Sequence, residues 1–290
     1  MKIKGLFRWL AYFFGDSLRY LLVPFLAAIM PRKLSGAWLT LASKWHWIFP
    51  ERDRVQAAMD HCFNDRPVEV EQVALTLLNE STTAWKLLIG RRLHVRQHAE
   101  WPSNLKFVAA GGHFGNGLCV LWSLKQAGLE PCFMLRRPAR DWRRPRPVVY
   151  YWSCVRFRLI ERICNGNLIV TGGARKKLRA ALESGSSTPV VLFDTPATPR
   201  DSNWMLPIGN SAITLPEGAR DIVTENACEV VLFLPLTNVG EVDAELYLER
   251  LDPAAGLAEA FPGKFANALS ESPAEWHFWP IIEPYLHRRS

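Results

Sequence analysis

The sequence predicts an α/β fold, a mixed central sheet flanked by helices, with an apolar helical segment at its N-terminus. From residue 104 onwards, short apolar runs alternate with helical segments, and several of these runs end in glycines. The 290 residues are enough for one large domain with a proper core. We therefore predict a membrane-associating segment over residues 1–35 and one α/β domain over residues 36–290.

The N-terminal run is basic first and then apolar and aromatic: MKIKGLFRWLAYFFGDSLRYLLVPFLAAIMPRK. A transmembrane helix needs roughly 20 uninterrupted apolar residues, whereas Arg8, Asp16 and Arg19 interrupt this run and Pro24 divides its second half. No convincing small-residue cleavage site of a signal peptide follows. The pattern favours two short helices lying in the membrane interface. A helix pair in the core and a single tilted span are the alternatives.

Residues 36–93 are expected to be helical, because apolar residues recur there every three or four positions. The expected strands are residues 104–112, 130–137, 166–173, 188–197, 228–237 and 245–251, and the expected helices are 116–128, 174–185, 211–227 and 262–276. In such a sheet, ligands gather at the carboxyl ends of the strands. The turns after the strands are therefore where a site is expected.

Composition narrows the class of partner. The net charge of +7 favours an anionic partner, and the twelve tryptophans suit a protein that meets a membrane interface. No nucleic-acid recognition motif accompanies the basic residues, so nucleic acid is not an expected partner. The six cysteines have no CxxC spacing, and the histidines have no metal-ligand spacing, so neither disulfides nor a metal site are predicted.

His113 follows an apolar run and two glycines in AAGGHFGNGLCV. Glycines permit a tight turn, and the start of the following helix presents free N–H groups that suit an oxyanion. A histidine in this place can take a proton from an attacking hydroxyl, although a single histidine in a turn is more often structural. His113 is the candidate base, and Phe114, Gly115 and Asn116 are the candidate oxyanion turn.

The run GGHFGN at a strand end resembles the motif of the lipid A late acyltransferases, the lauroyl and myristoyl transferases of the glycerolipid acyltransferase superfamily. In that motif, four residues separate the histidine from an Asp or Glu. The apolar N-terminus is similar to the family's membrane anchor. Three later stretches resemble family blocks in the same order: FDTPATPRDSNWMLPIGNSA, EGARDIVTENACEVVLFLP and SPAEWHFW.

The resemblance implies acyl transfer from a thioester of acyl carrier protein or coenzyme A to an acceptor hydroxyl. It implies His113 as general base, no metal or redox cofactor, a groove for the acyl chain, and a place on the cytoplasmic face of the inner membrane. This chain departs from the motif at Leu118, because leucine cannot accept a hydrogen bond from an imidazole. Asp194, Glu217 or a backbone carbonyl are the candidates to replace the acid.

Two further stretches supply candidate substrate-binding residues. Arg136 or Arg137 matches an arginine that follows the second strand in the family, and arginine binds phosphate bidentately. The other arginines of MLRRPARDWRRPRP are expected to be exposed and to steer anionic partners. Glu217 and Gly218 lie in LPEGAR, which resembles the acceptor-binding block of the glycerol-phosphate branch, although Pro216 and Glu217 also suit a helix start.

Because Leu118 replaces the acid, the acceptor stays open between a lipid A-type lipid and a specialised metabolite with a hydroxyl or amine. The main alternative is a catalytically inactive relative that binds lipid or carrier protein. A basic peripheral membrane protein without an acyl pocket, and a thioesterase that transfers the acyl group to water, are the others.

Overall fold

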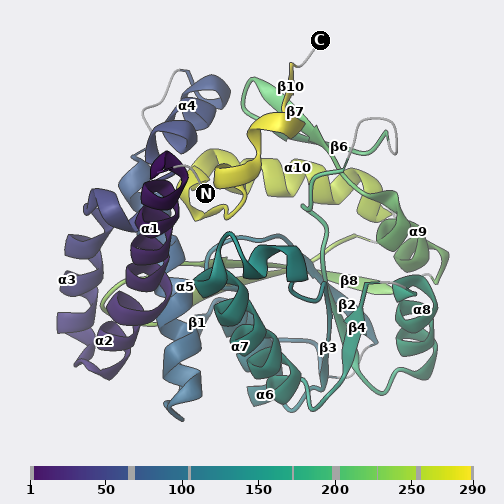
Figure 1. The fold of residues 1–290 in the computed structure, drawn as a ribbon. Coiled ribbons are helices and arrows are strands. Elements are labelled where there is room, and N and C mark those ends of the chain that lie inside the picture. The colour runs from purple at the N-terminus through teal and green to yellow at the C-terminus, as the bar shows by residue number, and fades with distance from the viewer. Residues whose placement is uncertain are drawn as a thin grey trace.

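The computed structural model describes residues 3–64, 69–103, 106–171, 173–197, 203–226, 228–252 and 256–288. A mostly parallel seven-stranded sheet forms the centre, with helices against both of its faces (Figure 1). Its strands, in spatial order, are β1 (Val95–Gln97), β9 (Ala244–Arg250), β8 (Glu229–Leu236), β2 (Phe107–Gly111), β5 (Thr188–Leu192), β3 (Pro131–Leu135) and β4 (Leu168–Val170). Only the β8–β9 pairing is antiparallel among these strands.

A small antiparallel sheet and the helices surround this centre. The small sheet contains β6 (Met205–Ile208), β7 (Ser211–Thr214) and β10 (His287–Arg288). The helices are α1 (Ile3–Ser17), α2 (Val23–Ile29), α3 (Arg32–Ser43), α4 (Arg52–Cys62), α5 (Val70–Leu88), α6 (Gly117–Gln126), α7 (Pro147–Ile163), α8 (Ala174–Ser184), α9 (Glu217–Glu225) and α10 (Gly256–Glu271).

The strand β2 is buried on both faces, as the continuous apolar run FVAA requires. Successive side chains of a strand point to opposite faces. Val108 and Ala110 belong to the core cluster that includes α10, whereas Phe107 and Ala109 belong to the cluster that includes α6 and α7. The turn after β2 is therefore held between two packed layers.

The predicted α/β class is confirmed, and two of the predicted elements differ. Residues 211–214 form the strand β7 instead of the start of a helix, because they pair with β6 across a turn at Gly209, whose φ is +55°. The last helix begins at Gly256 and ends at Glu271. The helix α7 and the strands β1, β6 and β10 are further elements that the sequence analysis does not contain.

The N-terminal run forms one nearly continuous helical stretch, in which the π-helical turn Leu18–Leu22 joins α1 to α2. Two of the charges that interrupt the run are buried in ion pairs with the main body. Asp16 pairs with Arg146, and Arg19 pairs with Glu51. The expectation that Arg146 is a solvated steering charge is therefore wrong.

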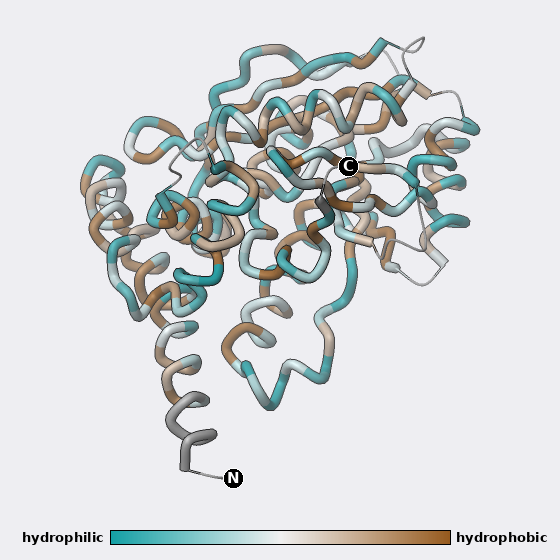
Figure 2. Tube along the Cα trace, turned by 90° about the horizontal axis from the view of Figure 1, so that it is seen from above, coloured by the Kyte–Doolittle hydropathy of each residue, from teal (hydrophilic) through white to brown (hydrophobic). Residues whose placement is uncertain are grey.

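One helical stretch, Trp9–Ile29, is long and apolar enough to cross a membrane, which by itself is weak support for membrane association. The stretch packs partly on the body, since α2 lies along α5, whereas α1 projects at one side of the molecule (Figure 2). Large apolar side chains of this region remain exposed to solvent: Phe14, Leu22, Phe25, Ile29, Leu34, Leu41 and Trp47.

Candidate functional site

The sheet register brings His113 and Asp194 together. The strands β2 and β5 are parallel neighbours, with Gly111 paired to Leu192. His113 and Asp194 each follow two residues after this pair, so they lie side by side where the two strands end. The Nδ1 atom of His113 lies 2.8 Å from Oδ1 of Asp194. The candidate base thus has a carboxylate partner, which comes from β5 and not from the position of Leu118.

The Asp194 carboxylate is fully buried and has three hydrogen-bond donors. Besides His113 Nδ1, the His113 backbone N–H donates to Oδ2 at 2.7 Å, and Trp276 Nε1 donates to Oδ2 at 2.8 Å. A buried carboxylate is stable only with such partners. With Nδ1–H donating to the carboxylate, the other ring nitrogen of His113, Nε2, is the one that can accept a proton.

Close backbone packing explains the glycines around His113. A Cβ atom on Gly112 would lie 2.2 Å from the ring of Phe265 and 2.8 Å from Asp194 Oδ2. Gly115 has a φ of +49°, and a Cβ atom there would lie 1.8 Å from the carbonyl oxygen of Pro235. Any side chain at these two positions would push the turn away from Asp194 or from β8.

The C-terminal segment 275–277 holds the other side of the turn. The His277 N–H donates to the His113 carbonyl at 2.9 Å, and the Gly115 N–H donates to the Glu275 carbonyl at 2.8 Å. The stretch SPAEWHFW therefore packs directly on the turn GGHFGN, although the two are more than 150 residues apart. Together with the Trp276 bond to Asp194, these contacts fix the direction in which His113 points.

The predicted oxyanion turn needs a correction. The Phe114 N–H donates to the Gly112 carbonyl, and the Gly115 N–H is paired as described above. Asn116 is buried, and its side-chain amide donates to Thr83 of α5. These groups build the turn. The first residues of α6, Gly117 and Leu118, line the cavity beside His113, and the first amides of a helix have no partner within it.

His113 lines a cavity of about 110 Å³ whose walls are mainly apolar. Leu118 is buried in this wall, at the position where the motif that GGHFGN resembles has an acid. No described residue bonds to His113 Nε2, and the His113 side chain is 36% exposed. The apolar lining consists of Phe114, Leu118, Val120, Leu121, Phe133, Ile160, Val190, Leu192 and Phe233.

A second cavity of about 300 Å³ adjoins the first, since both are lined by Arg156 and Ile160. The exposed residues Arg136 and Arg137 line this second cavity. These two arginines therefore line the cavity that adjoins the one at His113. Both cavities therefore border α7.

A buried polar cluster forms one wall of the small cavity. Arg156 of α7 lies 2.5 Å from Glu80 of α5, and His277 Nδ1 lies 3.5 Å from the other oxygen of Glu80. Burial alone would raise the pKa of Glu80, but the Arg156 charge and the two histidines of the cavity outweigh it and lower this pKa. Burial lowers the pKa of His277, and its Nε2 atom is buried with no partner among the described residues.

These three residues are not among the candidates predicted from the sequence, and the helix α7 that positions Arg156 is not predicted either. A signal for α7 does exist, since Pro147 opens a run with apolar residues at helical spacing: Val148, Trp152, Leu159, Ile160 and Ile163.

Glu217 and Gly218 are not part of this site. Glu217 is the first residue of α9, where its Oε1 atom accepts the Asn203 N–H and pairs with Arg220. Neither residue lines the two cavities beside His113. The expectation that they belong to the substrate site is therefore corrected, and their role is that of a helix start.

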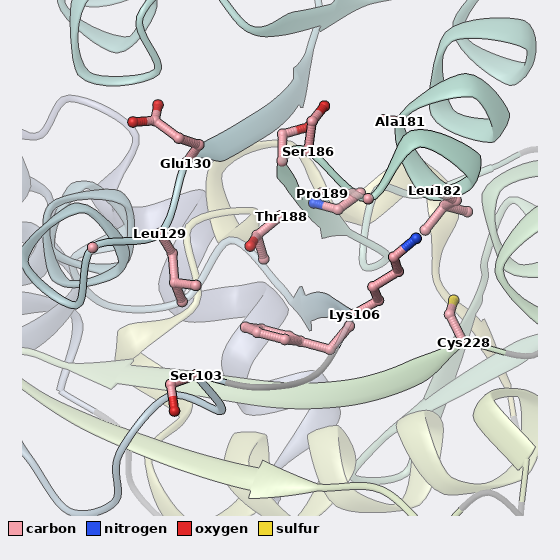
Figure 3. A pocket seen from close by; sticks show the side chains of 14 residues that line it. Ser103, Lys106, Leu129, Glu130, Ala181, Leu182, Ser186, Thr188, Pro189 and Cys228 are labelled. Atoms are coloured by element: carbon pink, nitrogen blue, oxygen red, sulfur yellow. The ribbon is translucent and has the colours of Figure 1, made fainter.

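Another cavity, of about 380 Å³, lies at the opposite end of the sheet (Figure 3). It is lined by residues at the amino ends of strands, such as Glu130 before β3 and Thr188 at the start of β5, together with Lys106 and Ser103. In parallel sheets, ligands bind at the carboxyl ends of strands. We therefore assign the candidate site to the His113 end.

The pKa shift of His277 leads to a prediction for stability. Because its pKa is lowered in the folded protein, the unfolded chain takes up this proton more readily, so stability falls as the pH drops below about 6.5. We expect the melting temperature of His277→Gln to fall less between pH 7 and pH 5 than that of the wild type. Scanning calorimetry measures both. His61→Gln, at an exposed position of α4, is the control. Equal losses in all three proteins would contradict the prediction.

No family model and no curated protein sequence matches this chain. The geometry of the site is therefore the basis on which a function can be inferred.

Proposed function

We propose that this protein is an acyltransferase that moves an acyl group from a thioester donor to a hydroxyl or amine acceptor. The observation that carries the proposal is the 2.8 Å contact between His113 Nδ1 and Asp194 Oδ1 at the mouth of an apolar cavity. A histidine oriented by a buried carboxylate is the arrangement that general-base catalysis uses. The apolar walls suit an acyl chain.

In the proposed reaction, the acceptor O–H or N–H gives its proton to His113 Nε2 while the oxygen or nitrogen attacks the thioester carbonyl. The carbonyl carbon forms the new C–O or C–N bond, and its bond to sulfur then breaks. The imidazolium returns the proton to the leaving thiolate, which yields a free thiol. The Asp194 carboxylate, in contact with His113 Nδ1, stabilises the imidazolium in between.

Two groups are suited to the negative charge on the carbonyl oxygen. Arg156 lines both cavities, and the start of α6 presents amides at the wall of the small one. Arg136 and Arg137 line the larger cavity, and we assign to them the phosphates of coenzyme A or of the phosphopantetheine arm of acyl carrier protein.

The proposal includes a place on the cytoplasmic face of the inner membrane. Its support is the set of exposed apolar side chains on α1 to α3 together with the positive net charge. A lipid A-type lipid and a specialised metabolite both remain acceptors within this proposal, because both can supply the hydroxyl or amine that His113 deprotonates.

Free-thiol release tests this function. Purified protein is incubated with acyl-coenzyme A or acyl carrier protein thioesters and a lipid or metabolite extract. We expect release that depends on the extract and falls about 10²–10⁴-fold in His113→Ala, whereas His61→Ala at an exposed position keeps the wild-type rate. Equal release by the wild type and His113→Ala would refute the proposal. Release that needs no extract would indicate a thioesterase.

The second candidate is a catalytically inactive relative that binds lipid or carrier protein. Two observations favour it: Leu118 occupies the position of the motif's acid, and the cavity at His113 is small against the roughly 300–1,000 Å³ of typical ligand sites. A wild-type protein that binds acyl thioesters but releases no thiol would support this candidate.

A further inference from the structure

A cavity of about 460 Å³ lies where the end of α2, the start of α3 and the end of α5 meet. It shares no lining residue with the two cavities near His113. Four of its lining residues are arginines or lysines. The lining residues are Ile29, Met30, Pro31, Arg32, Lys86, Arg91, Arg92, His94 and Asp243.

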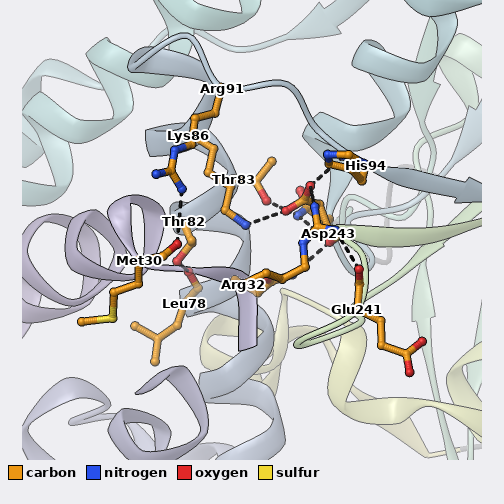
Figure 4. A network of polar contacts seen from close by, with 12 residues as sticks. Met30, Arg32, Leu78, Thr82, Thr83, Lys86, Arg91, His94, Glu241 and Asp243 are labelled. Atoms are coloured by element: carbon orange, nitrogen blue, oxygen red, sulfur yellow. Dashed lines mark hydrogen bonds and ion pairs between the residues drawn. The ribbon is translucent and has the colours of Figure 1, made fainter. Parts of the chain in front are cut away.

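A single buried carboxylate organises one side of this cavity. Figure 4 shows Lys86, Arg32 and His94 around Asp243. The distances to its oxygens are 2.6 Å from Lys86 Nζ, 3.5 Å from the Arg32 guanidinium and 2.7 Å from the His94 backbone nitrogen. The single negative charge of Asp243 is thus shared between Lys86 and Arg32, and its contacts orient both side chains.

Two further arginines add positive charge without a carboxylate partner among the described residues. The guanidinium of Arg91, which lies beside Met30 in Figure 4, donates to the carbonyls of Ile29 and Met30 at the end of α2, at 3.0 and 3.3 Å. These bonds orient Arg91 but do not neutralise it. Arg92 is exposed, and the structure gives it no bonding partner in the part of the chain that it describes. The cavity therefore carries an excess of positive charge.

The helices that border this cavity, α2 and α3, also carry exposed apolar side chains. Ile29 lines the cavity and is 45% exposed, and Leu34 on the next helix is 61% exposed. Phe25, one turn before Ile29 on α2, is also exposed. Basic residues next to exposed apolar side chains on short helices are typical of proteins that bind the surface of an anionic membrane.

We propose that this cavity binds the phosphate headgroup of an anionic phospholipid while the apolar side chains of α2 and α3 enter the acyl layer. Arginine pairs suit phosphate because their planar N–H groups bind its oxygens bidentately. A soluble phosphate would bind the cationic side chains but leave Ile29 and Leu34 in water. A phospholipid contacts both the cationic cavity and the exposed apolar side chains. The inference rests on the membrane placement within the proposed function and names the lipid group that is bound, but it requires no acyl transfer.

Vesicle flotation tests this site with the full chain. Vesicles of phosphatidylcholine alone are compared with vesicles that also contain phosphatidylglycerol. We expect the wild type to prefer the anionic vesicles, and Arg92→Gln to lower that affinity about fivefold. The double variant Arg91→Gln/Arg92→Gln is expected to lose more. Since Arg92 has no described partner, its variant tests the site even if loss of Arg91 disturbs the end of α2.

The matched control is Arg175→Gln/Lys176→Gln, which removes two exposed charges from α8. It is expected to keep the wild-type preference for anionic vesicles. A loss equal to that of the double variant would show that net charge alone drives binding, and would overturn the site. Glycerol 3-phosphate that binds as tightly as the vesicles and displaces the protein from them would overturn the lipid as ligand. Leu34→Ser is expected to weaken binding to both kinds of vesicle.

Discussion

Asp194→Asn is expected to lower kcat for thiol release by about 10⁴-fold, the size of the loss known for the equivalent change in the serine-protease triad. The reason is the 2.8 Å contact to His113 Nδ1. An asparagine can present its N–H₂ group there, which favours the tautomer that carries the proton on Nε2 and so removes the base. Single-turnover rates of thiol release measure the effect, and circular dichroism checks that the variant is folded.

The control for this variant is Glu217→Gln, at the other carboxylate that the sequence offers as a substitute for the missing acid. Glu217 pairs with Arg220 at the start of α9 and lines neither cavity at His113. We expect its kcat to stay within about threefold of the wild type, as for a surface substitution. A larger loss in Glu217→Gln than in Asp194→Asn would show that the wrong carboxylate has been assigned.

Gly115→Ala is expected to have the largest effect on folding. The residue has a φ of +49°, and its new Cβ would lie 1.8 Å from the Pro235 carbonyl oxygen. Backbone strain and forced displacement of β8 together cost about 3 kcal/mol, which corresponds to a fall in Tm of roughly 5–10 °C. Thermal unfolding followed by circular dichroism measures this change.

Gly117→Ala, two residues along, is the matched control. Nothing lies within 4 Å of a Cβ at this position, and Gly117 is already the first residue of α6. Because alanine favours helix more than glycine does, the free energy of unfolding is expected to rise by less than about 1 kcal/mol. If both variants lost the same stability, the close approach of Gly115 to Pro235 would not be the cause.

The α/β class is predictable because the buried strands are short continuous apolar runs with helical segments between them. The sequence also predicts that Asp194 follows such a run, as His113 does. The order of the strands within the sheet, however, cannot be read from the sequence. The chain places β3 and β4 between β2 and β5 in sequence, yet β2 and β5 are neighbours in the sheet. Only this pairing identifies Asp194 as the partner of His113.

Other features of the site depend on contacts that no local pattern contains. His277 lies in an aromatic run whose spacing gives no hint that it packs against the His113 turn. Asp16 and Arg146 are 130 residues apart, and each looks like a surface charge until the other is found. The amides of Phe114 and Gly115 look available in the sequence because the carbonyls that bind them are set by the folded turn and by Glu275.

We propose that Asp194 has the role that the resembled motif gives to an acid at the position of Leu118, and Leu118→Glu tests this assignment most directly. Leu118 is buried in the wall of the cavity at His113, so a glutamate there would replace apolar lining with a carboxyl group. The measurement is thiol release by the wild type and Leu118→Glu side by side, with the same thioester and extract. We predict an active wild type and no gain in Leu118→Glu. An inactive wild type that becomes active in Leu118→Glu would contradict the role of Asp194. It would favour the second candidate function, a catalytically inactive protein that binds lipid or carrier protein.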